Sequence, residues 1–262
     1  TTAPSITGLV PGDKTISLGQ TVTFSVTATD ANTVADVKLY NNVGVAIGSF
    51  AHQAGNLWNY TSTAYNTKGN YQYYIVATDS VGNQKREPLT TGYYTITVND
   101  LIWDLSSPSG WNLVSVPKTL TVNSKSSLLP SNVVWSYNSG SWINPSTITS
   151  GVGYWVNNAP LTSKGLDYAT QTSNQTLPSE TITLRQGWNL IGHMCINTQD
   201  VSVAFPTSIY NNLFVLRYNK TTDSFQIYAT QNTGSAQFTQ MTPGEGYWVF
   251  VPSGDLVYTN IC

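Results

Sequence analysis

Apolar and polar residues alternate in short runs through the first hundred positions of the chain. From Thr21 to Thr29 four apolar side chains are separated by threonine and serine: Val22, Phe24, Val26 and Ala28. A period of two residues places such side chains on one face of a β-strand. Similar runs follow at 34–40, 45–50, 57–64, 71–78 and 93–98. The pattern predicts an all-β fold whose strands each bury one face.

Turn-forming residues separate these runs, as at Asn41-Asn42, Gly69-Asn70 and Gly82-Asn83. About seven short strands in a hundred residues is the spacing of an immunoglobulin-like or fibronectin-III-like sandwich. The segment 69–83, with the sequence GNYQYYIVATDSVGN, resembles the Ig-like modules of bacterial and archaeal surface proteins. That resemblance implies an Ig-like β-sandwich over residues 1–99.

The remainder of the chain contains an internal duplication. Gly110-Trp111-Asn112-Leu113 returns as Gly187-Trp188-Asn189-Leu190, and Gly153-Tyr154-Trp155-Val156 returns as Gly246-Tyr247-Trp248-Val249. The order is the same in both halves, which predicts two copies of one β unit at 100–182 and 183–262. One copy alone would expose an apolar face and free strand edges. We therefore expect residues 100–262 to form one duplicated β-barrel or β-sandwich domain.

Four of the eight tryptophans occupy equivalent positions beside glycines in the two copies: Trp111, Trp155, Trp188 and Trp248. A repeated large aromatic residue of this kind is typical of a core position, so we expect these four to form the buried core of the repeat. The other four are Trp58, Trp103, Trp135 and Trp142, and none has a tryptophan counterpart in the duplication. Packing or subunit contact is their favoured role, and stacking on sugar rings is the alternative.

Charge is scarce throughout the chain. Only 9% of residues are charged and the net charge is −2, while serine and threonine make up about a quarter of the sequence. Eleven basic residues without a basic run provide no surface for tracking phosphates, which argues against nucleic-acid binding. No apolar stretch approaches the roughly 18 to 20 residues that cross a bilayer, which argues against membrane insertion. The composition suits a secreted β-protein.

The residues that usually carry catalysis are few and scattered. His52 and His193 are the only histidines, and the thirteen carboxylates are spread singly, several of them in turns. An active site needs a convergent set of titratable groups, so we expect no catalytic centre, no metal and no cofactor. Calcium at the loops of Asp30 or Asp79 is a minor alternative.

The two cysteines, Cys195 and Cys262, predict a disulfide within one chain, with a disulfide between subunits as the alternative. Closing a loop of this length contributes about 4 kcal/mol in the chain-entropy model. Three Asn-x-Ser/Thr sequons are candidate glycosylation sites, at Asn59, Asn174 and Asn219. Chance alone gives a similar number in a chain this rich in asparagine and threonine.

An Ig-like module followed by paired GWNL and GYWV motifs resembles S-layer-type and other cell-surface proteins of archaea and bacteria. The resemblance implies an extracellular structural protein that assembles with copies of itself into an envelope layer, sheath or filament. Few surface lysines and glutamates fit this role, because such residues normally block pairing between strand edges. The alternative is a secreted module that binds polysaccharide or mediates adhesion. We expect the extended segment 1–7 to reach a neighbouring subunit.

Overall fold

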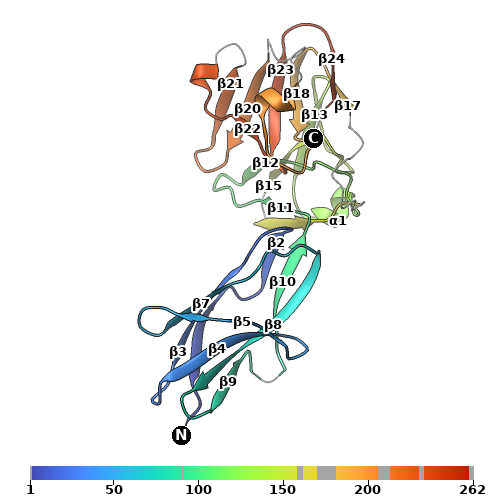
Figure 1. Cartoon of the computed structure of the whole chain (residues 1–262). Helices are drawn as coiled ribbons and strands as arrows, with labels where there is room; N and C mark the ends of the chain where they lie inside the picture. The colour runs from blue at the N-terminus through green and yellow to red at the C-terminus, as the bar shows by residue number, and fades with distance from the viewer. Residues whose placement is uncertain are drawn as a thin grey trace. The chain divides into compact units, whose positions relative to one another are not determined.

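The computed structural model describes residues 2–89, 91–157, 162–169, 181–205, 213–229 and 233–259. The chain divides into two compact units, residues 1–100 and 101–262 (Figure 1). This boundary lies one residue from the position at which the duplicated region was expected to begin. Both α-helices in the described ranges are four residues long, and no helix there is long and apolar enough to span a membrane.

The first unit is a sandwich of two β-sheets. One sheet has the order β1 (Ser5–Val10), β3 (Thr23–Thr29), β7 (Leu57–Thr61) and β6 (Ala51–His52). The other has the order β2 (Lys14–Ser17), β10 (Tyr94–Asn99), β8 (Gly69–Asp79), β4 (Val34–Asn41) and β5 (Ala46–Ser49), and β9 (Gln84–Glu87) also pairs with β8. All pairs are antiparallel except β2 with β10.

The alternating side chains fill the space between these two sheets. Phe24 and Val26 of β3 are fully buried, and they pack in one cluster with Leu39 of β4 and Ile75 of β8. The intervening threonines and serine of β3 are exposed or half-buried. The predicted all-β fold with an Ig-like or fibronectin-III-like sandwich is therefore confirmed.

Residues 5–7 of the segment expected to reach a neighbouring subunit are part of the first sheet. Ser5, Ile6 and Thr7 belong to β1 and pair with β3 in the first sheet. Ile6 is buried in the sandwich core. Its burial and the backbone hydrogen bonds of β1 hold this segment on its own domain.

The second unit consists of two copies of one arrangement. The first copy contains β11 (Leu101–Asp104), β12 (Trp111–Ser115), α1 (Lys125–Leu128), β13 (Val134–Asn138), β14 (Ser141–Ile143), β15 (Gly153–Asn157) and β16 (Ser163–Leu166). The second contains β17 (Thr181–Leu184), β18 (Gly187–Gly192), β19 (Gln199–Asp200), α2 (Val201–Ala204), β20 (Phe214–Asn219), β21 (Ser224–Ala229), η1 (Thr233–Ser235), β22 (Gln240–Met241), β23 (Gly246–Val251) and β24 (Leu256–Thr259).

Corresponding strands pair in the same order in both copies. The four-stranded sheets run β12-β15-β13-β14 and β18-β23-β20-β21, and the two-stranded sheets are β11-β16 and β17-β24. Leu113 lies opposite Trp155 in the first copy, and Leu190 lies opposite Trp248 in the second. The repeated motifs therefore occupy equivalent strands in the same register. Each copy also encloses its own hydrophobic cluster.

Reciprocal backbone contacts join the two copies. The amide of Ser115 donates to the carbonyl of Gly244, and the amide of Gly192 donates to the carbonyl of Gly151, each at 2.8 Å. A Cβ atom placed on Gly192 would lie 2.5 Å from the Cβ of Ser115, and one on Gly153 would lie 2.8 Å from the carbonyl oxygen of Ile191. These glycines thus allow the strands of the two copies to approach closely.

Candidate functional site

The four-stranded sheet of each copy turns one face toward its core and the other outward. In β15 the side chain of Tyr154 is buried, and in β23 the side chain of Tyr247 is buried. Successive side chains of a strand point to opposite faces. Trp155 and Trp248, which follow these tyrosines, therefore lie on the outer faces of their sheets.

The expectation that the four repeated tryptophans form a buried core is wrong. Trp188 is 42% exposed, and Trp111, Trp155 and Trp248 are all partly exposed. The GYWV motif carries apolar residues at successive positions, so a shift of one residue decides which face is buried. In both GYWV motifs the tyrosine side chain points into the core and the tryptophan side chain points to the outer face.

The repeated core tyrosines were not predicted from the sequence. The backbone amide of Thr149 donates to the hydroxyl of Tyr154, and that of Thr242 donates to the hydroxyl of Tyr247, each at 2.7 Å. A buried tyrosine hydroxyl needs such a partner. A threonine stands five residues before the tyrosine and six before the tryptophan in both copies, so this spacing alone does not identify which of the two is the core residue.

On the outer faces, the tryptophan of each GYWV motif packs against the other copy. The ring of Trp155 meets the ring of Tyr218 edge-on at a centroid distance of 4.8 Å. Trp248 meets Tyr137 edge-on at 5.1 Å. Tyr137 and Tyr218 lie on the corresponding strands β13 and β20, so the two contacts are equivalent. The aromatic faces of the two sheets therefore form one continuous surface.

An open groove of about 830 Å³ crosses this surface, and we call it the aromatic groove. Its lining residues are Trp111, Trp135, Trp142, Trp155, Tyr218, Asp223, Phe225 and Trp248. Trp142 is 53% exposed and Phe225 is 45% exposed, so flat ring surface is accessible to solvent. Seven of the eight lining residues are aromatic, and Asp223 is the single charged one.

Asp223 lies in the turn between β20 and β21, where its φ of +50° places it in the left-handed region. The hydroxyl of Tyr218 donates to Oδ1 of Asp223 at 2.5 Å. The same hydroxyl lies 2.9 Å from Oγ of Ser109. Among the described residues, no lysine or arginine forms an ion pair with Asp223. The groove therefore carries one unpaired negative charge at its rim.

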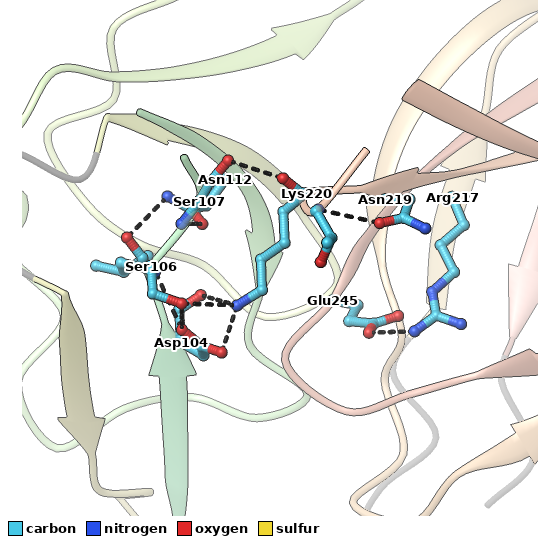
Figure 2. Close-up of polar contacts among 10 residues, drawn as sticks. Asp104, Ser106, Ser107, Asn112, Arg217, Asn219, Lys220 and Glu245 are labelled. Carbon is cyan, nitrogen blue, oxygen red and sulfur yellow. Dashed lines mark hydrogen bonds and ion pairs between the residues drawn. The ribbon is translucent and has the colours of Figure 1, made fainter. Parts of the chain in front are cut away.

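A second cavity, of about 460 Å³, lies where the two copies meet and contains four charged side chains. The ammonium of Lys220 pairs with the carboxylate of Asp104, and Nη2 of Arg217 lies 2.7 Å from Oε1 of Glu245 (Figure 2). We call this cavity the charged cleft, after Asp104, Arg217, Lys220 and Glu245. Its four charges neutralise one another in pairs.

Two pKa values are shifted at the charged cleft, that of Asp104 and that of Tyr247, which contacts Glu245. Burial raises the pKa of Asp104, but hydrogen bonds from Lys220 and Ser106 outweigh this effect and leave its pKa below the ordinary value. Burial, together with the negative charge of Glu245, raises the pKa of Tyr247 far above its usual range. The hydroxyl of Tyr247 donates to Oε2 of Glu245 at 2.8 Å. The Lys220–Asp104 pair joins the two copies across this cavity.

The tryptophans outside the repeated motifs divide into two groups. Trp58 is buried in the core of the first unit, and Trp103 is buried with its Nε1 donating to the carbonyl of Ser115 at 2.6 Å. Trp135 and Trp142 are exposed and line the aromatic groove. The sugar-stacking alternative therefore remains relevant for the second pair.

The remaining candidate residues are only partly described. Cys195 is buried, whereas Cys262 lies outside the described residues, so their pairing stays a prediction. Asn59 lies in β7, inside the first sheet, and Asn219 ends β20, where its Oδ1 accepts hydrogen bonds from the amides of the next turn. Asn174 also lies outside the described residues. Glycosylation of all three asparagines stays a prediction.

Among the described residues, no three histidine, cysteine, aspartate or glutamate side chains gather as metal ligands would. In the two loops suggested for calcium, Oδ1 of Asp79 accepts hydrogen bonds from the amides of Val81 and Asn83 at 3.0 and 2.8 Å, and Oδ1 of Asp30 accepts one from the amide of Asn32 at 2.7 Å. His193 is buried, its Nε2 lies 2.8 Å from the carbonyl oxygen of Asn197, and burial lowers its pKa. Asp79 and His193 therefore each have a hydrogen-bond partner within the chain.

No family model matches the chain, and no curated protein matches it. Among solved structures, the fibronectin(III)-like modules of Clostridium thermocellum CbhA are 15% identical over 58% of this chain and 77% of theirs, with a TM-score of 0.31. The titin I-band fragment I67–I69 is 12% identical over 100% of this chain and 94% of its own, with a TM-score of 0.33. These likenesses bear on neither the site nor the function.

Proposed function

We propose that the second unit is a non-catalytic binding module that holds a polysaccharide in its aromatic groove. The observation that carries this proposal is the set of seven aromatic side chains lining one open groove. Pyranose rings have apolar faces that stack on flat aromatic rings, and a ligand of several sugars matches a groove with several indoles. Soluble proteins that expose apolar patches of this kind commonly use them for binding.

The way the rings are held supports the proposal. Trp155 rests on Tyr218, and Trp248 contacts both Tyr137 and Trp142, the latter at a centroid distance of 5.8 Å. All of these side chains project from strands and contact rings of the other copy. Side chains that are ordered before binding lose little conformational entropy when a ligand arrives.

The placement of the charges also favours binding over catalysis. The groove holds one carboxylate, whereas hydrolysis of a glycosidic bond ordinarily uses two. The four charges of the charged cleft are engaged in ion pairs. As part of the same proposal, the chain works outside the cell. Polysaccharides are accessible there, and the composition of the chain, with few charged residues, suits a secreted β-protein.

Replacing Trp142 with alanine tests the groove. Trp142 is 53% exposed, so Trp142→Ala should leave the fold intact and weaken binding to a polysaccharide ligand about tenfold or more. Phe214→Ala is the matched control, because Phe214 is 43% exposed, does not line the groove and packs on Phe250 outside it. Affinity electrophoresis in gels containing soluble polysaccharides gives the readout. Equal retardation of both variants and the parent on every polysaccharide would remove the proposal.

A second candidate function, self-assembly through strand edges, rests on a feature of the first unit. Strand β5 ends its sheet, and residues 41–50 around it contain no charged side chain. Val43, Val45 and Ile47 are 75%, 56% and 46% exposed. Neutral, exposed edge strands pair readily with other chains.

Ile47→Lys tests assembly by placing a charge on this edge. If β5 joins subunits, the variant should stay monomeric at concentrations at which the parent forms sheets, tubes or fibres, as seen by electron microscopy and light scattering. Val81→Lys is the control, since Val81 is also exposed but lies in a turn away from β5. A parent protein that remains monomeric at high concentration would exclude this candidate.

A further inference from the structure

The charge of the aromatic groove narrows the choice of ligand. We infer that the groove selects a polysaccharide whose sugars carry free, protonated amino groups. This inference rests on the proposed function and adds a chemical class to it. Its basis is the combination of one unpaired carboxylate with a continuous set of aromatic faces.

The carboxylate of Asp223 is held in place at the rim of the groove. The Tyr218 hydroxyl donates to Oδ1, and Ser109 Oγ lies within hydrogen-bonding distance of that hydroxyl. No described residue donates a hydrogen bond to Oδ2 of Asp223, which leaves one carboxylate oxygen available to a ligand. Charge-assisted hydrogen bonds from an ammonium to a carboxylate are stronger than those between neutral groups.

Aromatic rings lie directly beside this carboxylate. Tyr218, which contacts Asp223, has its ring centroid 4.8 Å from that of Trp155 and 5.7 Å from that of Phe225. The faces of such rings carry negative electrostatic potential and attract cations. A protonated amine bound to Asp223 would therefore meet two favourable features, the carboxylate and the neighbouring ring faces.

The aromatic groove has no basic side chain that could bind an acidic polysaccharide. No lysine or arginine is among its lining residues. The basic residues nearest in the sequence, Arg217 and Lys220, are already paired with Glu245 and Asp104. Neutral sugars would stack on the rings but would make no use of the charge on Asp223. Charge complementarity thus favours a cationic ligand.

Two oligosaccharides of equal length test the inference directly: a chitosan oligomer with free amines and the fully N-acetylated chitin oligomer. The sugar backbone is the same in both, so a difference in affinity reports on the ammonium groups. By calorimetry at low ionic strength, with the amines protonated, we expect the chitosan oligomer to bind about five- to tenfold more tightly. Added salt should reduce this preference because Asp223 is exposed.

Asp223→Asn should abolish the preference while leaving binding of the chitin oligomer unchanged. Asparagine tolerates the left-handed conformation of this position, so the turn is preserved. Asp255→Asn is the matched control, because Asp255 is exposed and outside the groove, where it pairs with Arg185 at 2.5 Å. It should retain the full preference of the parent.

The outcomes separate this inference from the proposed function. Equal binding of the two oligomers would overturn the selection of amino sugars and leave a groove for neutral glycans. Absence of binding to these oligomers and to other polysaccharides would overturn both. Tetramethylammonium, a small cation, serves as a competing probe for the site at Asp223. If it displaces neither oligomer and Asp223→Asn keeps the parent's preference, the ammonium site is not at Asp223 and the inference fails. Binding of tetramethylammonium without any preference between the oligomers would also overturn it, in favour of a quaternary ammonium ligand.

Discussion

The two copies of the second unit share a backbone arrangement but differ in the side chains at their junctions. The charged cleft has a counterpart of about 440 Å³ formed by the equivalent segments of the opposite copies. The positions of Arg217, Lys220 and Glu245 are taken there by Ser136, Ser139 and Val152. The second of these two equivalent cavities is therefore formed without any ion pair among its lining residues.

The outer faces differ in the same way. Trp135 of the first copy corresponds to Leu216 of the second, and Trp142 corresponds to Phe225. Trp135 and Trp142 both line the aromatic groove. Trp111 of the first copy also lines it, whereas its equivalent in the second copy, Trp188, does not. Backbone hydrogen bonds and glycines therefore join the two copies, while substitutions on the strands give each side its own chemistry.

The largest effect is expected where the copies touch most closely. In Gly192→Ala the new Cβ would lie 2.5 Å from the Cβ of Ser115, so the strands must separate and the free energy of unfolding should fall by about 2 to 3 kcal/mol. Urea denaturation measures the loss. Adding Ser115→Gly removes the opposing atom and should restore part of it. If Gly192→Ala unfolds like the parent, the close junction is not required.

The positions of the strands could be predicted from the sequence because alternation and turn residues are local. Strand β3 was expected at 21–29 and spans Thr23–Thr29, and β4 was expected at 34–40 and spans Val34–Asn41. The identical motifs GWNL and GYWV also placed equivalent strands in both copies. The short edge strand β9, with the sequence QKRE, has no such alternation and was not predicted.

The aromatic groove could not be predicted because it depends on contacts between distant segments. Within GYWV, periodicity alone does not say whether Tyr154 or Trp155 faces the core. The answer comes from the hydrogen bond of Tyr154 to Thr149 and from the packing of Trp155 on Tyr218. The second contact joins residues of different copies, and local sequence carries no information on it.

The core tyrosines provide the next largest effect and separate the two copies. Tyr154→Phe leaves the amide of Thr149 without its partner and should cost about 1 kcal/mol. Tyr247→Phe removes the partner of the Thr242 amide and also a donor to the Glu245 carboxylate, so about 2 kcal/mol is expected. Chemical denaturation of both variants gives the difference. Equal losses would show that the bond to Glu245 contributes nothing.

A smaller effect is expected from converting the charged cleft into its neutral counterpart. Arg217→Ser leaves Glu245 without its cation, and because both side chains are one-third exposed we expect a loss of about 1 kcal/mol. The double variant Arg217→Ser with Glu245→Val reproduces the pair found on the other side of the junction. Because Glu245→Val also removes the acceptor of the Tyr247 hydroxyl, this double variant should recover only part of the loss in a double-mutant cycle. A double variant less stable than Arg217→Ser alone would mean that the two junctions are not equivalent.

The smallest effect concerns His193, whose counterpart in the first copy is the buried Val116. Burial lowers the pKa of His193 in the folded chain below the ordinary value of about 6.5. The unfolded chain therefore takes up the proton first, so stability is present above about pH 6.5 and is lost as the pH falls. We expect the melting temperature to decline below that pH in the parent and to decline less in His193→Gln. His52→Gln, at an exposed position of the first unit, is the control for the loss of a histidine. If the pH profile of His193→Gln matches that of the parent, the decline comes from carboxylates such as Asp104. The pKa of Asp104 is lowered in the folded chain, so its protonation also destabilises the fold as the pH falls, but at more acidic pH.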